Sequence, residues 1–323
     1  MAEFVAPFAR VATPKELPHL FFISGGALAV ENALKAAFDW KVRKNFEKGI
    51  KEEKGHKVIH FREAFHGRTG YTMSLTNTDP TKTNYFPKFD WPRIDNPKVV
   101  FPLEEHLKEV EGAEKKAIGQ IMQAIEKDPD DIAAIIIEPI QGEGGDNHFR
   151  AEFFKELRRI ADENEIILIF DEVQTGLGIT GKMWCHEHYG VRPDILAFGK
   201  KTQVCGIMAS DRINEVDSVF KVSSRINSTW GGNLVDMWRA KRILEIIETE
   251  KMVDNAAKMG ETFLEKLVEL EKQYPELISN SRGKGLFCAF DLTDTRCRDT
   301  FVTRCIEDGL LVLQCGPRTV RVR

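Results

Sequence analysis

The chain has 323 residues, enough for about two domains and far more than a disulfide-stapled miniprotein needs. Its 46 Lys and Arg against 50 Asp and Glu give a net charge of −4, and its 42% hydrophobic and 30% charged residues are typical of a folded globular protein. This composition gives no support for nucleic-acid binding, and no apolar segment approaches the ~20 residues of a membrane-spanning helix.

The first elements are a glycine-rich turn and a helix. Residues 24–27 read Ser-Gly-Gly-Ala, and the following segment 31–46 repeats its apolar residues at helical spacing. The apolar segment 57–61 predicts a short strand. The segment 84–102, rich in Pro, Phe and Trp, predicts a structured loop.

Three nearly continuous apolar segments follow, at 132–137, 166–170 and 194–198. Such segments are typical of strands buried on both faces, as in a parallel sheet covered by helices. Residues 153–163 lie between the first two strands and are expected to form the crossover helix. The alternation predicts an α/β architecture.

Each of these three strands leads into a polar residue that can do chemistry: Glu138, Asp171 and Lys200. In open α/β sheets, ligands bind beyond the carboxyl ends of the strands. We therefore expect these three residues to share one site.

The last quarter of the chain changes pattern, from long helices to a mixed αβ arrangement. This change predicts a large domain over 1–244 and a second, smaller domain over 245–323. The expected elements are a helical stretch over 237–271 broken at Val253-Asp254, a strand over 282–290, a helix over 298–307 and a strand over 310–314.

The cysteines give no sign of a disulfide framework or a metal site. No two of the six form a C-x-x-C pair, and they do not alternate with histidines at zinc-ligand spacing. The N-terminal residues also lack a basic segment followed by an apolar one, as a secretory signal would have. These features predict a cytoplasmic protein with reduced thiols and no bound metal.

Lys200 and Asp171 together suggest a specific cofactor chemistry. Pyridoxal phosphate (PLP) needs a lysine amine to hold its aldehyde as a Schiff base and a carboxylate beside its pyridine nitrogen. The carboxylate keeps that nitrogen protonated, because a nearby negative charge favours the cationic form. Either residue alone is more often a surface charge or a helix cap, so the pair carries the hypothesis.

A phosphate could bind where Gly25, Gly26 and Ala27 open the first helix. A helix N-terminus presents free N–H groups and a positive dipole end, and glycine lets an anion approach the backbone closely. The segment matches neither G-x-G-x-x-G nor G-x-x-x-x-G-K-[ST], so neither a dinucleotide fingerprint nor a P-loop is supported. An ordinary turn remains the alternative.

Four ordered stretches resemble the PLP-dependent class III aminotransferases of fold type I. Residues 65–69 are similar to the aromatic-plus-arginine loop of that family, and 137–145 to its Glu-Pro strand end. Residues 168–176 resemble its cofactor-aspartate strand, and 193–200 its Schiff-base lysine segment. The resemblance implies a large domain with a mostly parallel sheet flanked by helices, plus a smaller α/β C-terminal domain.

The resemblance also implies roles for individual residues at the cofactor. Lys200 would be the Schiff-base lysine and Asp171 the partner of the pyridine nitrogen, while Phe65 would stack on the ring. Gln174 would lie near the phenolic oxygen, and Thr229 would reach the phosphate of a neighbouring subunit, which implies a homodimer. The full cofactor-binding set is Gly26, Ala27, Phe65, His66, Asp171, Gln174, Lys200 and Thr229.

Three further residues resemble the family's substrate-binding positions. Arg68 would bind a substrate carboxylate, for which a planar guanidinium is well suited. Glu143 would pair with an arginine and swing away, and Arg321 would bind a carboxylate of 2-oxoglutarate. A solvated surface charge is the alternative for Arg321, because Arg323 lies two residues away.

Within the family, the details are most similar to the branch that moves the ε-amino group of L-lysine to 2-oxoglutarate. That reaction gives 2-aminoadipate 6-semialdehyde and L-glutamate. Transamination of 4-aminobutyrate remains an alternative, since that branch shares a similar Phe-Asp-Trp-Pro loop and Lys-Lys pair. The chain also lacks segments that the family usually has at both ends, so a catalytically silent fragment with an incomplete small domain is a further alternative.

Overall fold

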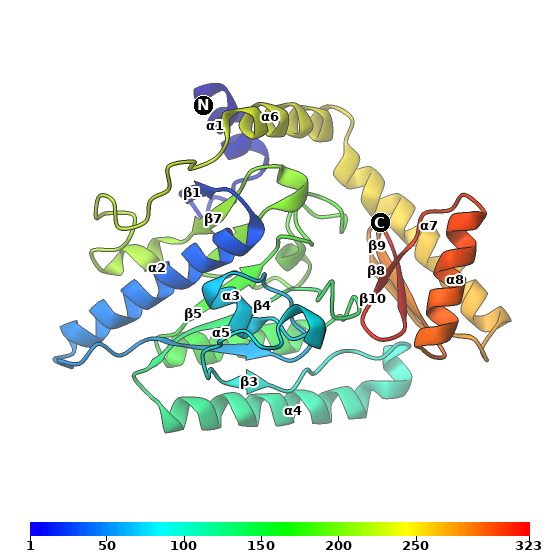
Figure 1. Cartoon of the computed structure of the whole chain (residues 1–323), viewed down its shortest axis with the longest axis horizontal. Helices are drawn as coiled ribbons and strands as arrows, with labels where there is room; N and C mark the ends of the chain where they lie inside the picture. The colour runs from blue at the N-terminus through cyan, green and yellow to red at the C-terminus, as the bar shows by residue number, and fades with distance from the viewer.

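A computed structural model describes residues 1–323 and contains two β-sheets (Figure 1). The larger sheet has seven strands in the order β1-β7-β6-β5-β4-β2-β3. Its strands are β1 (His19–Ile23), β2 (Lys57–Phe61), β3 (Arg93–Ile94), β4 (Ile132–Ile137), β5 (Ile167–Asp171), β6 (Ile195–Phe198) and β7 (Cys205–Ala209).

The direction of the strands fixes where the chemistry can occur. Neighbours β3, β2, β4, β5 and β6 all pair in parallel, and only β7 runs against its neighbours β6 and β1. The carboxyl ends of β4, β5 and β6 therefore meet at one edge of the sheet. This mixed, mostly parallel sheet confirms the predicted α/β architecture.

Helices cover both faces of the large sheet (Figure 1). Alternate residues of β4 show why: Ile135 and Ile137 pack in the cluster that includes α4 (Leu103–Lys127) and α5 (Ala151–Glu163), whereas Ala134 and Ile136 pack against α2 (Gly26–Glu47). Apolar residues at every position are required when both faces are buried.

A third apolar cluster joins α1 (Ala2–Val11) and α6 (Leu234–Thr249) to β6 and β7. The two helices lie side by side in Figure 1, although they are more than 220 residues apart in sequence. A short helix, α3 (Gly70–Leu75), follows the loop after β2. None of the helices combines the length and apolar character that crossing a bilayer requires.

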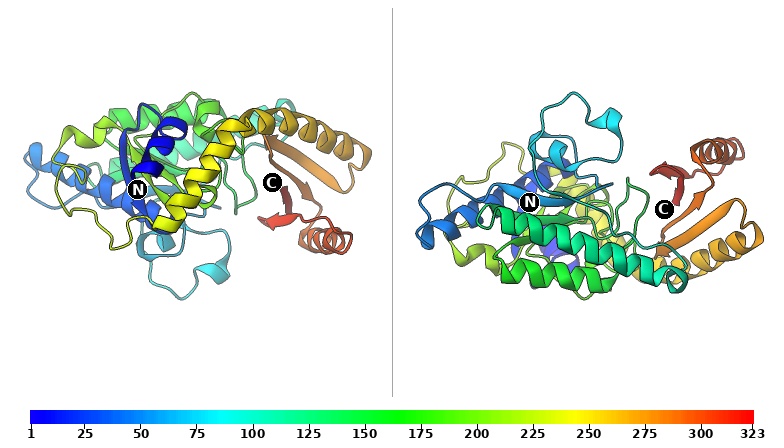
Figure 2. Two further views of the ribbon diagram at one scale, coloured as in Figure 1. Left: turned by 90° about the horizontal axis from the view of Figure 1, so that it is seen from above. Right: turned by 90° about the horizontal axis from the view of Figure 1, so that it is seen from below.

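The smaller sheet stands at one end of the molecule (Figure 2). Its four antiparallel strands are ordered β10-β11-β9-β8 and are accompanied by α7 and α8. The elements are α7 (Met252–Gln273), β8 (Ile278–Lys284), β9 (Phe287–Leu292), α8 (Thr295–Glu307), β10 (Leu313–Cys315) and β11 (Thr319–Val322).

The turn between β8 and β9 packs backbone against backbone. A Cβ atom at Gly260 in α7 would lie 2.1 Å from the carbonyl carbon of Gly285, and one at Gly285 would lie 2.4 Å from the carbonyl carbon of Thr180. The amide of Leu286 also donates to the carbonyl oxygen of Ile179 at 2.9 Å. The turn of the small sheet is therefore held between α7 and a loop of the large sheet, with no space for a side chain.

Three predicted elements differ from the structure. The break in the long helical stretch lies at Glu250 and Lys251, where Lys251 adopts a left-handed backbone, and not at 253–254. The expected strand over 282–290 is two strands, because Gly285 (φ 53°) turns the chain within it. The strand expected over 310–314 is confined to Leu313–Cys315.

Candidate active site

The predicted grouping of strand-end residues is present in the structure. Glu138, Asp171 and Lys200 line one cavity of about 600 Å³ at the carboxyl edge of the large sheet. Most of the sequence-predicted cofactor residues line it as well. The predicted residues in this lining are Gly26, Ala27, Phe65, His66, Arg68, Asp171, Gln174 and Lys200.

Asp171 is held in a fixed orientation at the end of β5. Its Oδ2 lies 2.8 Å from Nδ1 of His66, and its Oδ1 accepts a hydrogen bond from the Val173 amide at 3.1 Å. Both side chains are buried, and Nε2 of His66 has no partner within the protein. These two contacts fix the Asp171 carboxyl group at the cavity wall.

The two neighbouring lysines point to different places. Lys200 lines the cavity and begins a short 3₁₀ turn with φ 56°, a conformation that residues other than glycine adopt rarely. Lys201 instead donates from Nζ to the carbonyl oxygen of Gln174 and lines a separate apolar cavity beside Ile243 and Ile247. Partial burial lowers the pKa of the Lys200 amine. Lys200 is thus the lysine of this pair that reaches the cavity.

The amino end of α2 forms another wall of the cavity. Gly25 precedes the helix with φ 98°, and the first-turn amides of Gly26 and Ala27 belong to the N–H groups that have no partner within a helix. Gly67 packs closely against this turn: a Cβ atom at Gly67 would lie only 2.4 Å from Cβ of Ala27. The backbone here leaves a cradle for an anion.

These groups fit PLP. The cavity brings together a lysine amine, a buried carboxyl group in contact with Nδ1 of His66, and a glycine-rich helix N-terminus. They are the three kinds of group that an aldehyde, a pyridine nitrogen and a phosphate require.

Glu138 lines the cavity and is almost fully buried. Its Oε1 accepts from the Phe65 amide at 2.9 Å and its Oε2 from the Gly142 amide at 3.1 Å. Burial raises the pKa of Glu138 to about 7, against the opposing effect of His66. By tying Phe65 to the loop after β4, Glu138 positions the aromatic wall of the cavity.

Glu143 and Arg321 meet close to the cavity. The Arg321 guanidinium lies 2.7 Å from Oε1 of Glu143, and the Gln174 side-chain amide donates to the same oxygen at 3.2 Å. Burial alone would raise the pKa of Glu143, but the Arg321 ion pair lowers it to about 2. Nε and one terminal nitrogen of Arg321 are buried without a partner. Arg321 is therefore an ion-paired group of the interior and not a solvated charge.

This ion pair predicts a pH-dependent contribution to stability. The pKa of Glu143 is lower in the folded protein than its ordinary value of 4.5, so its stabilisation is present above pH 4.5 and is lost as the pH falls towards about 2. Glu143→Gln should lower the free energy of unfolding by roughly 2 kcal/mol at pH 7, after allowance for partial exposure. Urea titrations at pH 7, 4.5 and 3 check this, and a constant difference across that range would contradict it.

Arg68 and Thr229 are the remaining predicted site residues, and Arg323 lies two residues beyond Arg321 in the sequence. Arg68 is exposed at the cavity and has no ion-pair partner in the chain. Thr229 lies outside the cavity, exposed in the loop before α6, whose neighbouring Trp230 carbonyl accepts from Ser24 at 3.1 Å. Arg323 pairs with Asp146 at 2.7 and 2.9 Å and stacks on Phe287.

Several lining residues were missed by sequence reasoning. Thr69, Val173, Gln203 and Cys205 all line the cavity. Thr69 and Val173 are adjacent in sequence to the predicted residues Arg68 and Gln174, and this adjacency could have identified them as lining residues. Gln203 and Cys205 follow Lys200 around the 3₁₀ turn, where Gln203 has φ 60°, and no motif marks that reversal.

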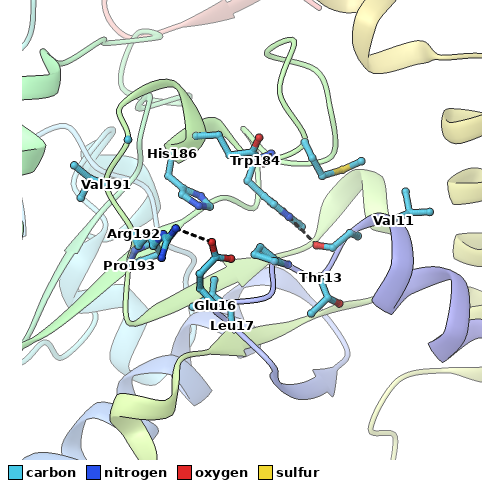
Figure 3. Close-up of a pocket in the computed structure, with 14 residues that line it drawn as sticks. Val11, Thr13, Glu16, Leu17, Trp184, His186, Val191, Arg192 and Pro193 are labelled. Atoms are coloured by element: carbon cyan, nitrogen blue, oxygen red, sulfur yellow. Dashed lines mark hydrogen bonds and ion pairs between the residues drawn. The ribbon is translucent and has the colours of Figure 1, made fainter.

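A second cavity, of about 470 Å³, lies between the end of α1 and the loop over 183–193 (Figure 3). It shares no lining residue with the cavity of Lys200. Its polar groups pair with each other: Arg192 binds Glu16 at 3.0 Å, and the Trp184 indole donates to the Ala12 carbonyl at 2.8 Å. The groups that fit PLP line the cavity of Lys200, and none of them lines this second cavity.

Comparisons with known proteins agree with this geometry. The family model described as "Aminotransferase class-III" matches residues 3–323. The L-lysine-epsilon aminotransferase of Mycobacterium tuberculosis is 54% identical over the whole chain and 72% of its own length. A solved structure, "Lysine aminotransferase from M. tuberculosis in the internal aldimine form", superposes with a TM-score of 0.98 over the whole chain and 74% of that structure. Human mitochondrial 4-aminobutyrate aminotransferase is 33% identical over 96% of the chain and 65% of its own length.

Proposed function

The chain belongs to the PLP-dependent class III aminotransferases, and on that premise we propose that it transfers the ε-amino group of L-lysine to 2-oxoglutarate. The products are 2-aminoadipate 6-semialdehyde and L-glutamate. The similarity to relatives named for lysine, at 49–54% identity, supports this donor over 4-aminobutyrate, whose named relatives are 32–33% identical. The single structural observation that carries the proposal is the Glu143–Arg321 pair, which contacts the cavity of Lys200 through the Gln174 side chain.

We assign the cofactor's contacts to residues of the same cavity. Lys200 holds the aldehyde, Asp171 faces the pyridine nitrogen and Phe65 covers the ring, while His66 orients the Asp171 carboxylate. The amides of Gly26 and Ala27 bind the phosphate, and Gln174 lies by the phenolic oxygen. When bound, PLP supplies an electron sink that makes a substrate C–H bond acidic.

The protein's own part of the reaction is proton transfer and positioning. With PLP bound, the free Lys200 amine would take the proton from the substrate carbon that bears the amino group, and Nζ would then pass that proton to the cofactor and not back to the same carbon. Its lowered pKa favours the neutral amine that this role requires. Asp171 would face the pyridine nitrogen, where a carboxylate favours the protonated ring.

Two arginines offer carboxylate sites for the two substrates. Arg68, without an ion pair, binds the α-carboxylate of lysine through its planar fork. While lysine is bound, Glu143 neutralises Arg321, and the second carboxylate of 2-oxoglutarate requires Arg321 to be released. One cavity can thus accept a monocarboxylate donor and a dicarboxylate acceptor in turn.

We further propose a cytoplasmic homodimer in which Thr229 binds the partner's phosphate. Large apolar side chains are exposed near Thr229, as a surface covered by a second copy would have. They are Trp230, Leu234, Val235 and Trp238, each 63–68% exposed. Free thiols at all six cysteines fit a reducing compartment.

The donor is tested by following the cofactor absorbance of the PLP-loaded protein. L-lysine should change the spectrum at least about tenfold faster than 4-aminobutyrate or L-ornithine. A site that pairs the α-ammonium leaves polar groups unsatisfied with 4-aminobutyrate, and L-ornithine is one methylene too short to place its amine and its α-groups together. Glu143→Ala should weaken the lysine half-reaction more than the glutamate one, since it leaves Arg321 as an unpaired cation. Faster reaction with 4-aminobutyrate would overturn the proposed donor but not the family.

A further inference from the structure

A lysine outside the predicted site lies against both Phe65 and Glu143. Nζ of Lys82 is 3.4 Å from Oε2 of Glu143 and 5.3 Å from the centre of the Phe65 ring. Lys82 ends a short 3₁₀ turn over Pro80–Lys82 that is capped by Asp79, whose side chain accepts from Thr81 at 2.9 Å. The ammonium is therefore presented to the site by a fixed turn.

Glu143 consequently has a cation on each of its two oxygens. Arg321 holds Oε1 at 2.7 Å and Lys82 reaches Oε2 at 3.4 Å, while the third neighbour, Gln174, is neutral. The longer distance makes Lys82 the weaker partner in the arrangement seen here. The side chains of Lys82 and Glu143 remain 29% and 22% exposed, which leaves both room to move.

If the proposed function holds, the reaction requires a second cation that can pair with the Glu143 carboxylate. When Arg321 binds the second carboxylate of 2-oxoglutarate, Glu143 loses its main partner while it is still half-buried and ionised. An unpaired, partly desolvated carboxylate beside an incoming dianion costs free energy, and a cation already in contact removes most of that cost. The alternate position of Glu143 must therefore lie near a positive charge.

We propose that Lys82 is that alternate partner: it retains the Glu143 carboxylate when Arg321 is released to bind 2-oxoglutarate. This inference rests on the proposed function and adds a specificity-determining residue to it. Lys82 acts through Glu143 and touches neither substrate, so it is a positioning residue. It favours the dicarboxylate half-reaction by stabilising the state in which Arg321 is free.

The test compares the two half-reactions in the PLP-loaded full chain. Lys82→Met should raise the KM for 2-oxoglutarate about fivefold to tenfold while leaving the KM for L-lysine within about twofold. Lys82→Arg keeps the charge and should restore most of the affinity for 2-oxoglutarate. In a Glu143→Gln background, Lys82→Met should have no further effect on either KM, since the carboxylate that it serves is absent.

Lys88→Met is the matched control. It removes the same charge from the same loop, where Lys88 donates to the carbonyls of Thr83 and Phe86 rather than to Glu143. The inference is overturned if Lys88→Met also raises the KM for 2-oxoglutarate selectively, or if Lys82→Met raises the KM values for both substrates equally. It is also overturned if Lys82→Met still raises the KM for 2-oxoglutarate in the Glu143→Gln background. A wild-type chain that is inert to L-lysine but active with another donor would instead refute the proposed function. The effect of Lys82→Met on the KM for 2-oxoglutarate would then be compared with its effect on the KM for that donor.

Discussion

Lys200→Ala should abolish transamination, with kcat falling by about 10⁴-fold or more, because the same amine both holds the cofactor and moves the proton. Borohydride reduction of the PLP-loaded wild type should attach the cofactor to Lys200, as peptide mapping by mass spectrometry would show. The variant should still bind PLP without a covalent bond, since the cradle at Gly26 and the carboxylate of Asp171 remain.

Lys201→Ala is the natural control for this result. Lys201 faces an apolar cavity and donates to a backbone carbonyl, so its loss should leave labelling at Lys200 intact. Label found on Lys201 in the wild type would refute the assignment of the two lysines.

Asp171→Asn should lower kcat by roughly 10²-fold or more, because the amide cannot hold a protonated pyridine nitrogen by charge. The protein should fold normally, since Asn keeps the shape of the side chain and can still accept the Val173 amide. The measurements are kcat from steady-state assays and the melting temperature from circular dichroism.

A second buried aspartate separates this catalytic effect from a structural one. Asp194 precedes β6 at the opposite edge of the sheet, where it accepts from the Leu168 amide and pairs with Arg158. Asp194→Asn should lower the melting temperature with little change in kcat in the surviving protein. A near-normal kcat for Asp171→Asn would mean that another group keeps the ring nitrogen protonated.

The centre of the fold could be predicted because it follows from local sequence. The strand at 132–137 is confirmed with its predicted bounds, since a short run of six apolar residues between polar neighbours favours a strand buried on both faces. The helix expected over 31–46 begins earlier, at Gly26, because glycines at a helix start weaken the periodic signal. The lining of the cavity by Glu138, Asp171 and Lys200 follows directly from the parallel arrangement of their strands.

Contacts made by side chains across long sequence separations could not be predicted in the same way. Lys82 and Glu143 are 61 residues apart, and the loop that carries Lys82 has no periodic pattern to fix its course. The amphipathic helix α4 was not anticipated either, although its apolar residues recur at helical spacing. The conformation of a loop and the contacts of a long side chain depend on tertiary packing, which local sequence patterns do not reveal.

The backbone contact between Gly260, Gly285 and Thr180 has a consequence for substrate length. Lys200 follows strand β6 of the large sheet, and Arg321 lies in β11 of the small sheet, so the span between the reacting amine and the distant carboxylate depends on how the two sheets are spaced. That distance depends on the backbone contact, where an added Cβ at Gly260 or Gly285 would lie 2.1 or 2.4 Å from the backbone opposite, and on side-chain contacts such as that of Arg323 with Asp146. Substitution of Gly260 or Gly285 should therefore change the chain length of the acceptor that reacts best, although neither glycine lines the cavity of Lys200.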